Sequence, residues 1–456
     1  MDLLSLVKGI NSVLWGYVLI FLLCGTGLYF TFSLRFVQIR KFGESFQKAF
    51  GDIKFGKKAG KEGMTSFQSL ATAIAAQVGT GNLAGSATAI AAGGPGAIFW
   101  MWISAFFGMG TIFAESTLAQ KFKTKVDGEV TGGPAYYIEK GLGSRKLASF
   151  FSITIIIALG FIGNMVQSNS IGEAFGSAFN INPVIIGVIV AILGGLIFIG
   201  GVSRIASFTE KAVPLMALLY IIGSLFIIIT NGSQIGRAFS DIFVGAFNPS
   251  AVAGGALGIG VKEAVRYGVA RGLFSNEAGM GSTPHAHAIA KVKHPGEQGL
   301  VAIVGVFVDT FIILTLNALV ILTTGTFTQN AQLAAEEQLT GIALTQQAFV
   351  NGMGSFGMYF IAIALLFFAF STIIGWYFFG EANIKFLFGN KGLTGYRALV
   401  LIFIVLGAAL KVDLVWELAD TFNGLMVIPN LIGLLGLAAV VKKILQEYES
   451  GEKDVQ

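Results

Sequence analysis

A polar, glycine-containing stretch interrupts an otherwise apolar segment between residues 65 and 95. Its centre reads Gln77-Val78-Gly79-Thr80-Gly81-Asn82. Glycine weakens the helical hydrogen-bond ladder, and asparagine competes for backbone hydrogen bonds. Non-helical backbone at membrane depth persists only where it is buried in protein or lines a watery cavity. A break here would present free amides that suit a carboxylate, and free carbonyls that suit sodium or an ammonium group.

A second apolar run, residues 253–290, has the same character. It contains AVRYGVARGLFSNEAGMGSTPHAHA at 264–288, with small residues, side-chain amides and charges in its centre. For the first segment alone, a continuous helix whose glycines allow close packing is an equal alternative. Corresponding interrupted helices in two halves of a chain are, however, a sequence sign of a transporter site at a repeat interface. The two segments together therefore favour a binding site.

The composition is that of an integral membrane protein. Of 456 residues, 54% are hydrophobic and only 12% are charged, and the mean hydropathy is +0.75. A soluble domain has about 25% charged residues. Apolar runs of spanning length fall near 12–34, 65–92, 95–120, 148–178, 183–202, 207–230, 253–290, 298–325, 354–388, 395–411 and 414–442. These runs predict eleven membrane-spanning helices, of which the first precedes a core of ten.

The predicted core divides into two sets of five helices, each beginning with an interrupted one. We expect four units: an extra helix and a cytoplasmic amphipathic segment at 1–64, a first repeat at 65–232, a second repeat at 233–445, and a cytoplasmic tail at 446–456. Most of the 30 Lys and Arg residues fall in alternate loops. That asymmetry predicts an external N-terminus and a cytoplasmic C-terminus in the cell membrane.

Two connecting segments have predicted structure of their own. Within residues 35–64, five apolar residues at roughly helical spacing predict an amphipathic segment on the membrane surface. They are Phe36, Ile39, Phe42, Phe46 and Phe50. Residues 326–353 lack Lys and Arg and predict an outer loop with a short helix. The net charge of +5 is spread over loops, which gives no reason to expect a nucleic-acid partner.

Three motifs resemble the sodium:alanine (glycine) symporters of the amino acid–polyamine–organocation superfamily. They are GTGN at 79–82, GGPGAIFWMWISAFFG at 93–108 and RGLFSNEAGMGS at 271–282. The resemblance covers essentially the whole chain. It implies an all-α fold of the leucine-transporter type, a five-plus-five inverted repeat with one extra N-terminal helix. It also implies sodium-coupled import of small neutral amino acids, alanine or glycine, by alternating access.

The resemblance also implies roles for individual residues. The V-G-x-G-N pattern at 78–82 implies that the amides of Thr80 and Gly81 bind the substrate carboxylate. It further implies a site for Na+ made of three carbonyls and two hydroxyls. These belong to Ala75, Val78, Phe368, Ser371 and Thr372. For the two hydroxyls alone, hydrogen bonding back to their own helix is the alternative.

Other polar and aromatic residues complete the predicted substrate site. Asn164 and Gln167 lie three apart on one helix face at membrane depth, where polar side chains are costly. Hydrogen bonding between helices is an equal explanation for them. Phe274, Met280 and Trp376 could restrict the site to small side chains. The predicted substrate-binding residues are Gln77, Gly79, Thr80, Gly81, Asn82, Asn164, Gln167, Phe274, Ser275, Asn276, Met280 and Trp376.

Charged residues in the spans need partners. We expect Arg271 with Glu277, or either with Asp309, as a candidate gate pair, and we expect the three histidines at the surface beside a cytoplasmic turn. Proton coupling and a passive channel are alternatives within transport. An enzyme would need a nucleophile–base pair or metal ligands at membrane depth, and the predicted spans offer no cysteine–histidine or clustered histidine set. The chain could function as a monomer.

Overall fold

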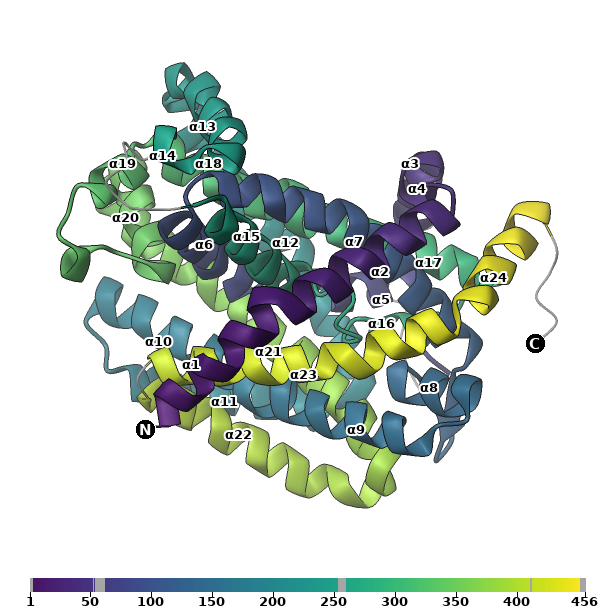
Figure 1. Ribbon diagram of the computed structural model, residues 1–456. Coiled ribbons are helices and arrows are strands. Elements are labelled where there is room, and N and C mark those ends of the chain that lie inside the picture. Colours follow the sequence, from purple (N-terminus) through teal and green to yellow (C-terminus); the bar gives the residue numbers. More distant parts are fainter. Residues whose placement is uncertain (1–2, 52, 54–61, 253–259, 411, 452–456) are drawn as a thin grey trace.

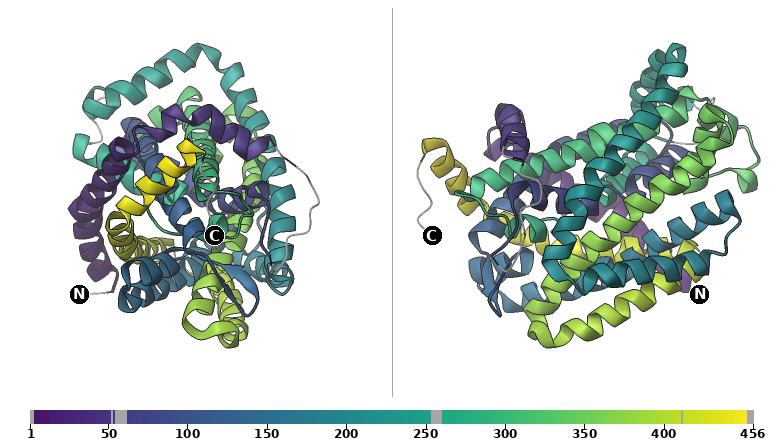
Figure 2. Two further views of the ribbon diagram at one scale, coloured as in Figure 1. Left: turned by 90° about the vertical axis from the view of Figure 1, so that its right-hand side faces the viewer. Right: turned by 180° about the vertical axis from the view of Figure 1, so that it is seen from behind.

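The computed structural model describes residues 3–51, 53, 62–252, 260–410 and 412–451, and this part of the chain is almost entirely helical. Helix α1 begins at one end of the molecule and α24 ends at the opposite end (Figure 1). The long helices run between these two ends, also when the molecule is seen from behind (Figure 2). The all-α prediction is therefore confirmed, apart from a two-stranded hairpin in which Lys125 pairs with Val130.

The first part of the chain, up to residue 247, contains α1 Leu3–Val13, η1 Leu14–Val18, α2 Leu19–Ser33, α3 Val37–Arg40, α4 Phe42–Phe50, α5 Ser66–Gln77, η2 Gly81–Gly85, α6 Ser86–Gly93, α7 Gly96–Lys121, β1 Thr124–Val126, β2 Glu129–Thr131, α8 Pro134–Leu142, α9 Arg145–Ile155, η3 Ile156–Gly163, α10 Asn164–Phe179, α11 Pro183–Phe198, α12 Gly201–Thr230, η4 Gly232–Gln234 and α13 Ile235–Phe247.

The remainder contains α14 Pro249–Val252, α15 Val261–Asn276, α16 Pro284–Ala288, α17 Pro295–Val306, η5 Phe307–Leu314, α18 Thr315–Thr323, α19 Thr326–Ala331, η6 Ala335–Glu337, α20 Gly341–Met353, α21 Phe356–Phe388, η7 Gly389–Gly392, α22 Leu393–Ala409, α23 Val412–Gly436 and α24 Ala438–Ser450. Four of the short elements, η1, η2, η3 and η5, are π-helical.

Seven helices among the described residues are long and apolar enough to cross a membrane. One of them, Phe356–Ala409, contains both α21 and α22, and the apolar helix Pro183–Phe198 is shorter. The two interrupted runs are divided into short helices, as predicted. The protein is thus a multi-pass membrane protein, while the count of eleven spans stays a prediction.

The helices pack in two groups. In one group α7 contacts α15 and α17; in the other, α10 contacts α21 and α22, and α11 contacts α22. Helix α5 contacts α17 of the first group and α21 of the second, so it lies between the groups. Helix α2 packs on α7, and α1 packs on α23; these N- and C-terminal helices cross the face seen in Figure 1.

The predicted amphipathic segment within residues 35–64 packs partly against other helices and is partly exposed. The rings of Phe42 and Phe46 lie 5.0 and 5.8 Å from that of Phe307, centroid to centroid, whereas the side chains of Ile39 and Phe50 are exposed. Only part of the predicted apolar face is therefore free to contact a membrane. The loop at 326–353 contains α19 and α20, which confirms the predicted short helix there.

Candidate binding site at the broken helices

The first break occupies Val78 and Gly79. Helix α5 begins with a capping box in which Thr65 and Gln68 satisfy each other's backbone amides, and it ends at Gln77. Val78 leaves the helical region at φ −82°, ψ 89°. The amide of Gly79 donates to Asn82 Oδ1 at 2.9 Å, and the chain continues as the π-helix η2. The glycine-rich motif thus breaks the helix where predicted.

Five oxygens gather on the carbonyl side of this break. Ser371 Oγ donates to the carbonyl of Ala75 at 3.2 Å and to that of Phe368 at 2.9 Å. Thr372 Oγ1 lies 3.0 Å from the carbonyls of Ala75 and Phe368 and 3.4 Å from that of Val78. All five residues are buried. Bonding within α21 explains only the contacts to Phe368, since the others cross to α5.

The amides after the break lie against neighbouring helices. The amide of Thr80 donates to Gln167 Oε1 on α10 at 3.2 Å, so this predicted substrate residue does meet the first break. A Cβ atom added to Gly81 would lie 2.9 Å from Ser275 Cα. One added to Gly79 would lie 2.3 Å from Thr372 Oγ1. Both glycines therefore allow approaches that no side chain permits.

The second break runs from Glu277 to Thr283, between α15 and α16. Glu277, Gly279 and Gly281 adopt positive φ values of 58°, 90° and 80°. The amides of Gly279 and Gly281 donate to the two carboxylate oxygens of Glu115, at 3.0 and 2.9 Å. Asn430 Nδ2 donates to the same carboxylate at 2.6 Å. A carboxylate from α7 therefore already occupies the amides of this break.

Asp309 on η5 connects the two breaks. Its Oδ1 accepts from Asn82 Nδ2 at 2.7 Å and from Ser275 Oγ at 3.0 Å. Gln77 Nε2 donates to the carbonyl of Asn276 at 2.7 Å. Two predicted substrate residues, Asn82 and Ser275, thus bind one buried carboxylate, and two others, Gln77 and Asn276, contact each other. The sequence predicts Asp309 only as a gate partner, although a carboxylate at membrane depth is itself a sign of a functional residue.

Aromatic rings cover the second break. Phe274 packs edge-to-face on Trp376 at 5.8 Å and tilted on Trp416 at 5.3 Å, centroid to centroid. Trp376 Nε1 donates to Glu277, and the Met280 side chain is fully buried. Phe274 and Trp376, two of the predicted substrate residues, are therefore in contact. Trp416 was missed because a single tryptophan near a helix end has no distinguishing pattern.

Three predicted substrate residues carry buried oxygens that lack a hydrogen-bond partner among the described residues: Gln77 Oε1, Thr80 Oγ1 and Asn164 Oδ1. The Asn164 amide nitrogen donates to Gly160 of its own helical segment at 3.0 Å. A buried acceptor left without a donor costs about 1–3 kcal/mol. These oxygens can accept from an ammonium group.

The predicted gate pair is wrong. Arg271 forms a double hydrogen bond with the carboxylate of Asp420 on α23, with both contacts at 2.8 Å, while its guanidinium carbon lies 5.4 Å from the Trp416 ring centroid. Glu277 accepts from Ser282 and Trp376 instead. The pair formed by Arg271 and Asp420 borders a cavity of about 280 Å³. Its lining includes Lys8, Thr88, Glu173, Arg271, Trp416 and Asp420.

The expected surface placement of the histidines is also wrong. His285, His287 and His294 are all buried, with exposed fractions of 1%, 1% and 6%. His285 lies 2.8 Å from Asn383 Nδ2, and His287 lies 2.7 Å from Gln298 Nε2. Packing of the short helix α16 between α5, α7 and α21 removes the first two from solvent.

Solved structures share this fold. A crystal structure of MhsT in complex with L-phenylalanine superposes with a TM-score of 0.57 at 14% identity, covering 86% of this chain and 99% of that chain. A variant of the Eremococcus coleocola manganese transporter gives 0.52 at 15% identity, covering 86% and 82%. The chain therefore has the leucine-transporter fold, with two broken helices at its centre.

Sequence relatives narrow this class. The sodium/alanine symporter AgcS of Methanococcus maripaludis is 43% identical, over 97% of this chain and 96% of that protein. The probable sodium/glutamine symporter GlnT of Bacillus subtilis is 44% identical, over 99% and 92%. The sodium:alanine symporter family model matches residues 1–456. The chain belongs to this family, which makes it a sodium-coupled amino acid symporter and confirms the resemblance.

Proposed function

We propose that this chain imports a small neutral amino acid, alanine or glycine, together with Na+ by alternating access. The observation that carries the proposal is the set of five oxygens at the first break. The carbonyls of Ala75, Val78 and Phe368 and the hydroxyls of Ser371 and Thr372 would bind sodium. Neutral oxygens make a weak site for a hard monovalent cation, and weak binding lets the ion leave inside the cell.

The amino acid would bind on the other side of the same break. Its carboxylate would take the amides of Thr80 and Gly81, where the helix begins again. The Thr80 amide now donates to Gln167, so that side chain must yield when the carboxylate arrives. The ammonium group would find acceptors among the unpartnered oxygens of Gln77, Thr80 and Asn164.

The remaining predicted residues would shape this site. Asn82, Ser275 and Asn276 hold the two breaks together through Asp309 and its neighbour Thr310, which Asn276 Nδ2 contacts at 3.2 Å. Phe274, Met280 and Trp376 would limit the room for the substrate side chain. This crowding favours alanine and glycine over larger amino acids.

Contacts at both ends of the broken helices would alternate during transport. At the end where α1 begins, which we take as the outside, the gate is Arg271 with Asp420. At the opposite end, Gln68 donates to Glu210 at 3.0 Å and Ser69 to the carbonyl of Ala286 at 2.8 Å. We take residues 65–232 and 233–445 as the two inverted repeats, and one chain suffices for this cycle.

Two alternatives rest on specific observations. The relative named for glutamine is as similar as the one named for alanine, so identity does not choose between these substrates. The buried carboxylate of Asp309, beside the first break, is a group that a proton could occupy, as proton coupling would need.

Uptake of radiolabelled alanine into proteoliposomes tests the proposal. We expect accumulation under an inward sodium gradient, and none when choline replaces sodium under an inward proton gradient of equal size. Unlabelled glycine should compete, whereas glutamine, lactate and alanine amide should not. Accumulation driven by protons alone would identify the proton-coupled alternative, and competition by glutamine stronger than by glycine would reassign the substrate.

A further inference from the structure

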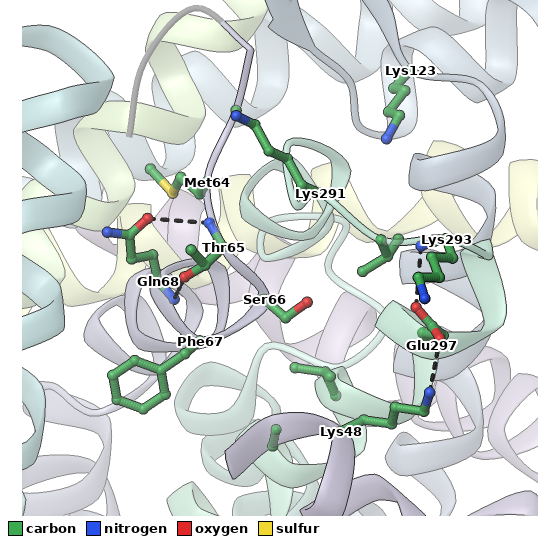
Figure 3. A pocket seen from close by; sticks show the side chains of 14 residues that line it. Lys48, Met64, Thr65, Ser66, Phe67, Gln68, Lys123, Lys291, Lys293 and Glu297 are labelled. Carbon is green, nitrogen blue, oxygen red and sulfur yellow. Dashed lines mark hydrogen bonds and ion pairs between the residues drawn. The ribbon is translucent and has the colours of Figure 1, made fainter. Parts of the chain in front are cut away.

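A large cavity lies at the end of the molecule where α24 ends, away from the proposed substrate site. Its volume is about 740 Å³, within the range of small-molecule sites. Four segments line it: the end of α4, residues 63–68, residues 291–293 and the first turns of α17, together with Lys123 (Figure 3). The cavity therefore adjoins both the start of α5 and the segment that follows α16.

The lining carries an excess of positive charge. Among the described residues that line it are Lys48, Lys123, Lys291 and Lys293 but a single carboxylate, Glu297. Lys48 pairs with Glu297 at 2.8 Å. The ammonium groups of Lys291 and Lys293 contact no carboxylate within hydrogen-bonding distance in the part of the chain that the structure describes. These two charges are free to bind an anion.

Neutral donors face the same space. Ser66 is the first residue of α5, whose N-terminus carries the positive end of the helix dipole. Figure 3 shows its hydroxyl directed toward the interior of the cavity. Lys123 Nζ lies across the cavity and contacts Gln120 Oε1 at 2.8 Å. A ligand here would contact lysine ammonium groups on one wall, and the Ser66 hydroxyl and the positive end of the α5 dipole on another.

This chemistry suits a phosphate group rather than the transported species. An excess of ammonium groups repels sodium, and a zwitterionic amino acid has no net charge to gain from them. Lysine binds phosphate as a compact point charge, and basic pockets at cytoplasmic membrane surfaces bind lipid headgroups. A phosphate group is carried both by anionic phospholipids and by free inorganic phosphate.

The two walls of the cavity are joined directly. The amide of Met64 donates to the carbonyl of Ile289, and the amide of Lys291 donates to the carbonyl of Met64, both at 2.9 Å. Under the proposed function, these segments must separate when the site opens to the cytoplasm. A phosphate group that contacts Ser66 on one wall and Lys291 and Lys293 on the other would hold them together.

We propose that this cavity binds a phosphate group, and that the bound phosphate stabilises the state closed at this end. The proposal rests on the proposed function only in its second part, because binding can be measured without transport. A basic residue near an anionic membrane surface contributes about fivefold in affinity, and on this scale the loss of Lys291 and Lys293 should weaken binding roughly thirtyfold.

The binding test uses the purified full-length chain in a neutral detergent. Inorganic phosphate is titrated against chloride at constant ionic strength, and the midpoint of thermal unfolding is measured. The cavity variant Lys291→Gln/Lys293→Gln is compared with Lys442→Gln/Lys443→Gln, which removes the same charge from α24 outside the cavity. We expect the concentration for half-maximal stabilisation to rise roughly thirtyfold in the cavity variant only. Equal responses in both variants would overturn the site.

Nanodiscs distinguish the source of the phosphate group. A higher midpoint for the unaltered chain in phosphatidylglycerol than in phosphatidylcholine, absent in the cavity variant, would identify a lipid headgroup. Stabilisation by inorganic phosphate in phosphatidylcholine would identify the free ion. If neither probe separates the two variants, the proposal is refuted.

Transport then tests the second part. In proteoliposomes that contain the phosphate source identified by the binding test, the cavity variant should take up alanine faster than the unaltered chain. In phosphatidylcholine without inorganic phosphate the two rates should be the same. Equal rates in the presence of that source, with binding confirmed, would refute the stabilisation of the closed state. If neither protein transports alanine at all, the proposed function fails while the binding result stands.

Discussion

Both broken helices leave backbone amides without helical partners, but different groups bind those amides at the two breaks. At the second break, the amides of Gly279 and Gly281 are bound by the carboxylate of Glu115, a permanent part of the chain. At the first break, the amide of Thr80 meets only the neutral oxygen of Gln167, and the carbonyls gather beside two hydroxyls. A ligand carboxylate can displace a neutral amide far more readily than a buried carboxylate. The comparison supports our proposal that exchangeable ligands bind at the first break, whereas the second break is held by a carboxylate of the chain itself.

The largest effect should come from placing a side chain at the first break. In Gly79→Ala the added Cβ would lie 2.3 Å from Thr372 Oγ1, so that the proposed sodium ligand must move. We expect sodium-driven alanine uptake to fall to background while membrane insertion is retained. Gly85→Ala is the matched control, because its Cβ would meet nothing closer than 3.8 Å. Normal uptake by the Gly79 variant would remove the binding site from this break.

Removing the internal carboxylate should destabilise the protein. Glu115→Ala leaves two buried backbone amides without an acceptor, and Asn430 Nδ2 keeps only its bond to the carbonyl of Gly279. Each unsatisfied donor costs about 1–3 kcal/mol, so the two amides predict a loss of about 2–6 kcal/mol. Thermal unfolding in detergent measures it. Glu139→Gln, which breaks a partly exposed pair with Arg145, should change stability by less than about 0.5 kcal/mol. An unchanged midpoint for Glu115→Ala would show that the second break does not depend on this carboxylate.

Loss of the two hydroxyls should weaken sodium binding much more than alanine binding. Ser371→Ala with Thr372→Ala removes two of five oxygens, and hydrogen bonds to charged groups are worth about 1.5–3 kcal/mol each. We expect the sodium concentration for half-maximal uptake to rise at least about a hundredfold, with a much smaller change in the alanine requirement at saturating sodium. Thr154→Ala is the control, because that hydroxyl bonds only to carbonyls of its own helix. An unaltered sodium dependence would place the ion elsewhere.

The sequence predicted the breaks because their cause is local. Glycines and an asparagine within an apolar run disfavour a continuous helix wherever the helix packs. The five clustered oxygens followed from the family pattern at 78–82 and from the hydroxyl pair on α21. Composition alone would have left Ser371 and Thr372 as ordinary helix hydroxyls.

The missed contacts are those set by packing between distant helices. Arg271 pairs with Asp420, and Glu115 binds Gly279, across sequence separations of 149 and 164 residues. Several acids could reach Arg271 from helix ends, and residue spacing within one helix does not choose among them. His285 was misplaced for the same reason, since its partner Asn383 lies 98 residues away.

Binding of sodium and of the amino acid at the first break should be positively coupled. Sodium would fix the carbonyls just before the first break, and the amino acid carboxylate would fix the amides just after it. The ligand that binds first orders the segment at the break, so the second ligand loses less conformational entropy when it binds. This gives positive coupling without direct contact between the ligands. The coupling should be about 1–3 kcal/mol, and reciprocity requires the same factor in both directions. Calorimetric titration of alanine at several sodium concentrations measures this factor. Glu115→Gln, which alters only the second break, should leave the factor unchanged in the folded protein. An alanine affinity that does not depend on sodium would mean that the two ligands do not share one broken helix.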